Sequence, residues 1–115
     1  MTAHVETYDI AFDGEHLQAQ LVSLPNGAEV VDAFMELTGA VVLTVSPVRN
    51  SLGTEQVVYL LGERGALGTG SRFVRTVFNH NLPAVLHVYV APANEHTRRD
   101  VDHAARHRAL RYRTA

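Results

Sequence analysis

Residues 40–62, AVVLTVSPVRNSLGTEQVVYLLG, contain two short runs that are dense in valine, leucine and threonine. The runs are AVVLTVS (40–46) and EQVVYLLG (55–62), and the segment between them holds proline, asparagine and glycine. Short, nearly continuous apolar runs of this kind are typical of strands buried on both faces. We therefore expect two central strands of a sheet, joined by a loop.

Two further segments extend this sheet in the prediction. AVLHVYVA (84–91) is another apolar, β-branched run. Near the start of the chain, residues 8–12 alternate between apolar and polar side chains, Asp13-Gly14 is a two-residue turn signal, and residues 17–21 continue the alternation. This pattern favours a β-hairpin.

Three segments are predicted to be helical. PNGAEVVDAFMELTG (25–39) offers a capping box from Asn26 to Glu29 and a stripe of Val30, Phe34 and Leu37. SRFVRTVFN (71–79) follows a glycine-rich turn and places its apolar residues on one side. The last helix spans 94–113, with Asn94 as its cap, its acidic residues early and its arginines late.

These elements predict the order ββαββαβα and the α+β class. We expect one domain over residues 1–115, with about five strands in a mainly antiparallel sheet packed with two to three helices. The stretch from Glu55 to Ala91 fits a right-handed βαβ crossover. The C-terminal helix is expected to be exposed.

The composition excludes several chemistries. The chain has no cysteine, so disulfides, thiolate nucleophiles and zinc-finger sites are excluded. It has no lysine, which removes Schiff-base chemistry and the P-loop lysine. No serine lies in a nucleophile elbow, and no triad can be assigned, so the chain is not expected to be an enzyme and no cofactor is predicted. Without a signal pattern or an apolar span, a soluble cytoplasmic protein that does not enter membranes is expected.

Charge is divided unequally along the chain. Residues 1–70 carry nine acidic residues against two arginines, whereas residues 71–115 carry eight arginines against three acidic residues. This division predicts that the C-terminal part contacts an anionic partner: nucleic acid, an acidic protein surface, or the acidic half of a second copy in a homo-oligomer. The alternative is that the fold brings the two halves together within one chain.

The segment HTRRDVDHAARHRALRYR (96–113) concentrates this charge. At about 100° per residue, Val101, Ala105 and Tyr112 form a thin apolar seam that is expected to dock, and His96, Asp100, His103 and His107 form a stripe that is expected to face outward. His103 and His107 have the spacing of a helical metal pair, and Asp100, His80 or His87 could supply a third ligand. Because no glutamate lies between the two histidines, as the HExxH pattern requires, no metal is predicted. The predicted partner-binding residues are Arg98, Arg99, Arg106, Arg108, Arg111 and Arg113.

An alternative site lies in the glycine-rich segment ERGALGTG (63–70) before the predicted helix at 71–79. Such a turn directs backbone N–H groups and a helix dipole toward an anion. Gly68 and Gly70, followed by the strand LHVYVAPAN ending at Asn94, resemble the coenzyme A loop and last strand of the GCN5-related N-acetyltransferases. That resemblance implies an acyl-CoA or nucleotide site. The position of that family's usual general-acid tyrosine holds Val101. The candidate phosphate-binding residues are Arg64, Gly68, Gly70, Ser71, Arg72 and Arg75.

The sequence is therefore compatible with three functional hypotheses. The first is an interaction module that uses its arginine-rich C-terminal half on an anionic partner. The second is a phosphate-ligand-binding enzyme that uses the glycine loop. The third is a phage virion or assembly component, because arginine in place of lysine is typical of a GC-rich genome such as that of an actinobacterium or its phage.

Overall fold

The computed structural model describes residues 3–7, 18–24, 28–37, 40–49, 55–61, 70–78 and 85–114, with side chains at all of these except 3–7, 47–49 and 107–114. The described residues form seven strands and one helix. In chain order these are β1 (Ala3–Thr7), β2 (Gln18–Ser23), β3 (Ala28–Met35), β4 (Val41–Arg49), β5 (Glu55–Leu61), β6 (Arg72–Phe78), β7 (Val85–Pro92) and α1 (Glu95–Thr114).

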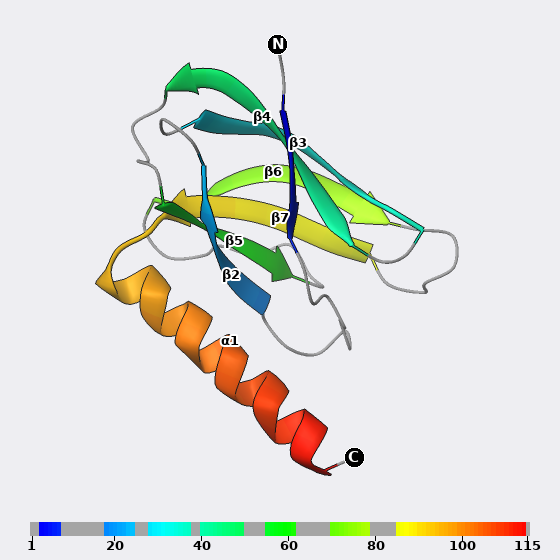
Figure 1. Ribbon diagram of the computed structural model, residues 1–115, viewed down its shortest axis with the longest axis vertical. Coiled ribbons are helices and arrows are strands. Elements are labelled where there is room, and N and C mark those ends of the chain that lie inside the picture. Colours follow the sequence, from blue (N-terminus) through cyan, green and yellow to red (C-terminus); the bar gives the residue numbers. More distant parts are fainter. Residues whose placement is uncertain are drawn as a thin grey trace.

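The strands form two antiparallel sheets (Figure 1). One sheet has the order β1-β4-β3 and the other has the order β2-β5-β7-β6. The two runs that opened the sequence, now β4 and β5, occupy interior positions of different sheets. The many valines of β4 and β5 are suited to these positions, because a strand with neighbours on both sides has little contact with water.

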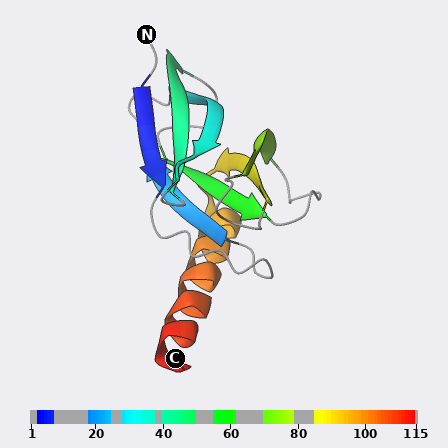
Figure 2. The ribbon, with the colours of Figure 1, turned by 90° about the vertical axis from the view of Figure 1, so that its right-hand side faces the viewer.

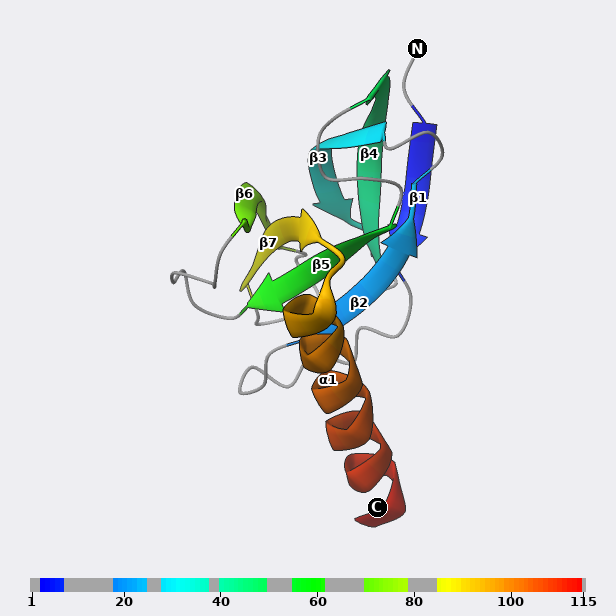
Figure 3. The ribbon, with the colours of Figure 1, turned by 90° about the vertical axis from the view of Figure 1, so that its left-hand side faces the viewer.

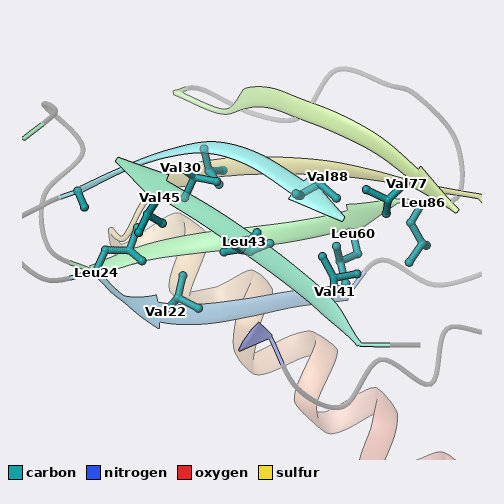
Figure 4. Close-up of a cluster of buried hydrophobic side chains, with 14 residues drawn as sticks. Val22, Leu24, Val30, Val41, Leu43, Val45, Leu60, Val77, Leu86 and Val88 are labelled. Atoms are coloured by element: carbon teal, nitrogen blue, oxygen red, sulfur yellow. The ribbon is translucent and has the colours of Figure 1, made fainter. Parts of the chain in front are cut away.

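The main core fills the space between the two sheets. Figure 4 shows side chains from β4, such as Leu43, meeting side chains from the other sheet, such as Leu60 and Val88. All three are at most 4% exposed. Within β5 and β7, alternate residues point into this core, as the two-residue period of a strand requires.

A second, smaller core lies on the opposite face of the β2-β5-β7-β6 sheet. There Val57, Tyr59 and Tyr89 pack with Ala19 and with Ala104 of α1. The molecule therefore has three layers in the order sheet, sheet, helix (Figures 1 and 3).

Two predicted helices are wrong, and with them the α+β assignment with two to three helices and a single five-stranded sheet. Residues 28–35 are β3 and residues 72–78 are β6. Both strands carry register shifts, between Val30 and Asp32 in β3 and between Phe73 and Arg75 in β6. A bulge adds one residue and so brings residues three apart to the same face. This spacing imitates a helical stripe.

The predicted pairings also differ from the structure. Of the predicted hairpin over residues 8–21, residues 18–21 belong to β2, which pairs with β5, and the other strand, residues 8–12, lies outside the described residues. Its turn, Asp13-Gly14, lies outside the described residues. The βαβ crossover is wrong as well, because β5 and β7 are adjacent and antiparallel. The strands predicted at 40–46, 55–62 and 84–91 and the C-terminal helix are all present.

In the part of the chain that the structure describes, no helix combines the length and the apolar character that crossing a membrane requires.

Candidate functional site: the basic helix and the groove between β3 and β6

The start of α1 is fixed by a reciprocal cap. The Thr97 N–H donates to Asn94 Oδ1 at 2.9 Å, and the Asn94 N–H donates to Thr97 Oγ1 at 2.8 Å. The Thr97 hydroxyl donates in turn to the carbonyl oxygen of Pro92, the last residue of β7, at 2.9 Å. The predicted cap at Asn94 is confirmed, and it ties the helix to the end of β7.

The face of α1 that docks on the sheet differs from the predicted seam. Val101 of that seam packs against the smaller core as predicted, but Thr97 and Ala104 are buried and Ala105 is exposed. The side chain of Tyr112 lies outside the described ones. Asp100, which was expected to face outward, accepts a 2.5 Å hydrogen bond from the hydroxyl of buried Tyr59. The helix is therefore rotated by roughly a quarter turn from the predicted orientation, given about 100° per residue. The docked face includes the polar contact between Asp100 and Tyr59, which a projection of apolar residues does not detect.

The contacts of α1 give its direction over the sheet. Arg98 Nη2 lies 3.2 Å from Glu55 Oε2 at the start of β5, and Asp100 meets Tyr59 further along that strand. The helix therefore runs toward the end of β5. Figures 2 and 3 show that its first half lies against the sheet and that its C-terminal half extends beyond the strands.

The docked half and the projecting half of α1 also differ in charge. In residues 95–102, two arginines accompany three acidic residues, and both arginines form ion pairs: Arg98 with Glu55, and Arg99 with Glu95 at 2.6 Å. Residues 103–114 hold Arg106, Arg108, Arg111 and Arg113 and no acidic residue. Arg106 is exposed, and among the described residues it takes part in no ion pair. The projecting half of α1, residues 105–114, follows buried Ala104 and thus carries arginines and no acidic residue.

The arginines of β6 join the two sheets. Arg72 Nη2 donates to the Val30 carbonyl oxygen at 2.6 Å and lies 3.8 Å from Glu29 Oε1. Arg75 Nη1 donates to both carboxylate oxygens of Asp32, at 2.9 and 3.0 Å. These hydrogen bonds, with one from the Ala33 N–H, hold the pKa of Asp32 below its usual value. Both arginines therefore connect to the acidic strand β3.

The alternative phosphate site required a helix at residues 71–79, but residues 72–78 form the strand β6. Ser71 and Arg72 lie at the start of a strand, so no helix dipole is directed at that point. Gly70 has a φ of 85° and sits against the ring of Pro92, which gives it a role in packing. Arg64 and Gly68 lie outside the described residues.

The histidines of the predicted stripe do not form a metal site in the described part of the chain. No group of three potential ligands occurs among the described residues. His103 is exposed, and the side chain of His107 lies outside the described ones. On the sheet, His87 Nδ1 lies 2.8 Å from the hydroxyl of Thr76 on the neighbouring strand, which is a structural contact.

A groove that sequence reasoning missed lies between the edge strands β3 and β6. Its volume is about 310 Å³, and Phe34, Met35 and Phe78 line it beside the Asp32–Arg75 pair. Phe34 is 44% exposed and Phe78 is 60% exposed, although Phe34 was predicted in the apolar stripe of one helix and Phe78 on the apolar side of another. The helical interpretation of their segments concealed this exposure, and no local pattern signals the pairing of the two strands.

No family model, curated protein or solved structure matches this chain, so function has to be inferred from its own residues.

Proposed function

We propose that the protein is an interaction module that binds an anionic partner through the projecting half of α1. One observation carries the proposal. Four described arginines of the C-terminal part, Arg72, Arg75, Arg98 and Arg99, form ion pairs within the chain, whereas residues 105–114 hold four arginines without an acidic residue. This half of the helix is the part of the basic surface that remains for a partner.

Nucleic acid is the partner class that we favour. Binding to the acidic half of a second copy competes with existing pairs, because Glu29, Asp32 and Glu55 already contact arginines of their own chain. The phosphate backbone of a nucleic acid, in contrast, can be bound by exposed basic side chains without a cavity. Arginines distributed on an exposed helix neutralise its phosphates and release counterions. An acidic protein surface remains the alternative partner of the same helix.

The test measures binding of fluorescently labelled single-stranded and duplex DNA by anisotropy at low ionic strength. Wild type is compared with a variant in which Arg106, Arg108, Arg111 and Arg113 are replaced by glutamine. The matched control carries Arg98→Gln and Arg99→Gln, which remove two charges from the docked half. We expect the fourfold variant to lose binding and the control to retain most of it. A wild type that binds neither DNA at low salt, or equal losses in both variants, would contradict the proposal.

A further inference from the structure

Two histidines lie among the basic residues of α1 and take no part in the proposed function so far. His103 is exposed, and it precedes buried Ala104, where the docked half of the helix ends. His107 belongs to the projecting half. A histidine side chain gains a positive charge between about pH 8 and about pH 5, whereas arginine remains charged throughout this range. This end of α1 therefore combines permanent positive charges with charges that depend on pH.

The surroundings of His103 contain permanent charges of both signs. A hollow of about 450 Å³ lies along α1, and its described lining consists of one histidine, two arginines and two aspartates: Arg99, Asp100, Asp102, His103 and Arg106. While His103 is neutral, the charges of the two arginines and the two aspartates cancel. A proton on His103 makes the lining positive, so this one group sets the sign of the charge in the hollow.

The other charged and titratable groups near the hollow are held in contacts within the chain. Asp100 accepts the hydrogen bond of Tyr59 on β5, and Arg99 lies 2.6 Å from Glu95 in the first turn of the helix. The strands that α1 contacts, β2 and β5, carry one charged residue among their described side chains, Glu55, and it forms an ion pair with α1. Carboxylates, arginines and tyrosines ordinarily keep their charge state between pH 8 and pH 5. Among the residues that line the hollow, the histidine is therefore the one whose charge changes in this range.

From this arrangement we infer that pH regulates the proposed interaction: protonation of His103 and His107 strengthens the binding of α1 to the phosphates of a nucleic acid. The inference rests on the proposed function and adds its regulation. His107 follows His103 by four residues, so the two lie about one helical turn apart at the basic end of α1.

The chemistry of the imidazole ring gives the direction of this effect. A neutral ring keeps one nitrogen as an acceptor, whereas a protonated ring carries a positive charge and donates from both nitrogens. Each contact that a single strand gains adds about −0.7 to the slope of log K against log salt concentration, which at about 0.1 M salt corresponds to about fivefold in affinity. Binding is therefore expected to tighten as the pH falls.

The test uses the full chain and measures the anisotropy of a labelled oligothymidine of about 12 nucleotides at about pH 7.5 and at about pH 5.5. Neither thymine nor the phosphodiester titrates in this range, so a change in affinity comes from the protein. Wild type is expected to bind about 5-fold to 25-fold more tightly at the lower pH. The double variant His103→Gln with His107→Gln is expected to lose this gain.

Two further variants make the test specific. His96→Gln is the matched control, because His96 is an exposed histidine of the docked half that does not line the hollow. It is expected to keep the full gain at low pH. His103→Arg carries its charge at both pH values and is expected to bind more tightly than wild type at the higher one. Thermal unfolding at both pH values verifies that each variant is folded.

The outcomes separate this inference from the proposed function. Equal affinity of wild type at the two pH values, or a gain at low pH that the double variant retains, overturns the inference. A gain that His96→Gln abolishes overturns it too, because the response then comes from outside the basic end of α1. In each of these cases the proposed function is still supported if the fourfold arginine variant has lost binding. If wild type does not bind at either pH, the proposed function fails, and this inference fails with it.

Discussion

At the scale of single residues, Tyr59 and Asp100 show how a polar contact fixes the helix on the sheet. Tyr59 is 2% exposed, and its hydroxyl donates to the carboxylate of Asp100 at 2.5 Å. Burial, followed by the hydrogen bond to this carboxylate and its negative charge, raises the pKa of Tyr59 above its ordinary value of 10.0. The protonated tyrosine is therefore the form that the fold favours.

This contact predicts a dependence of stability on alkaline pH. A group whose pKa is raised by folding contributes its full stability below its unfolded pKa and loses that stability as the pH rises above it. Tyr59→Phe is expected to lower the free energy of unfolding by roughly 1–2 kcal/mol at pH 8. The difference from wild type should shrink when the pH is raised above about 10, the ordinary pKa of tyrosine. Urea unfolding at the two pH values checks this, since the other tyrosines titrate in both proteins. A difference independent of pH would refute it.

Gly70 is the second residue for which the structure makes a specific prediction. Its φ of 85° lies where side chains are disfavoured, and an added Cβ would lie 3.3 Å from Pro92 Cδ. Gly70→Ala is expected to cost roughly 1–2 kcal/mol of stability, measured by chemical denaturation. Gly70→Asn should cost less, because asparagine tolerates positive φ better. An alanine variant as stable as wild type would show that the backbone here relaxes freely.

At the scale of elements, the sequence predicted those whose pattern is regular. The runs that became β4, β5 and β7 are β-branched and apolar, and α1 has a capping asparagine with its charges sorted along the helix. β3 and β6 were mistaken for helices for a physical reason. The register shifts of both strands break the two-residue period, so Val30 and Ala33 enter the main core three positions apart, as do Val74 and Val77. Tertiary pairing, which no local window contains, selected the strand.

The cap of α1 gives the prediction for this scale. Asn94 and Thr97 exchange two hydrogen bonds, so Asn94→Ala leaves the N–H of Thr97 without its acceptor. We expect a loss of about 0.5–2 kcal/mol, seen as a lower melting temperature of the whole fold, because the first turn also carries the link to Pro92. Asn94→Asp retains the oxygen and should be close to wild type. Equal melting temperatures of the Asn94→Ala and Asn94→Asp variants would show that the side-chain oxygen of the cap does not stabilise the fold.

At the scale of the whole molecule, folding pairs part of the basic C-terminal segment with the acidic first half of the chain. Arg72, Arg75 and Arg98 belong to the basic part of the chain, and each pairs with an acidic residue of the first half. The sequence could indicate that one part was basic but could not distinguish arginines that join sheets from arginines that remain for a partner. Only the assembled layers separate the two groups, and they leave the projecting half of α1 as the basic end. The groove was still less accessible to prediction, because its walls come from two sheets.

The most direct measurement of the central claim is the salt dependence of binding to single-stranded DNA. Each phosphate contact with a single strand contributes about −0.7 to the slope of log K against log salt concentration, so four arginines predict a slope near −3 for wild type. Single replacements of Arg106, Arg108, Arg111 or Arg113 by glutamine should each reduce the magnitude of this slope by a similar increment, whereas Arg98→Gln should leave it unchanged. A wild-type slope near zero, or one that changes as much with Arg98→Gln as with Arg106→Gln, would contradict the account.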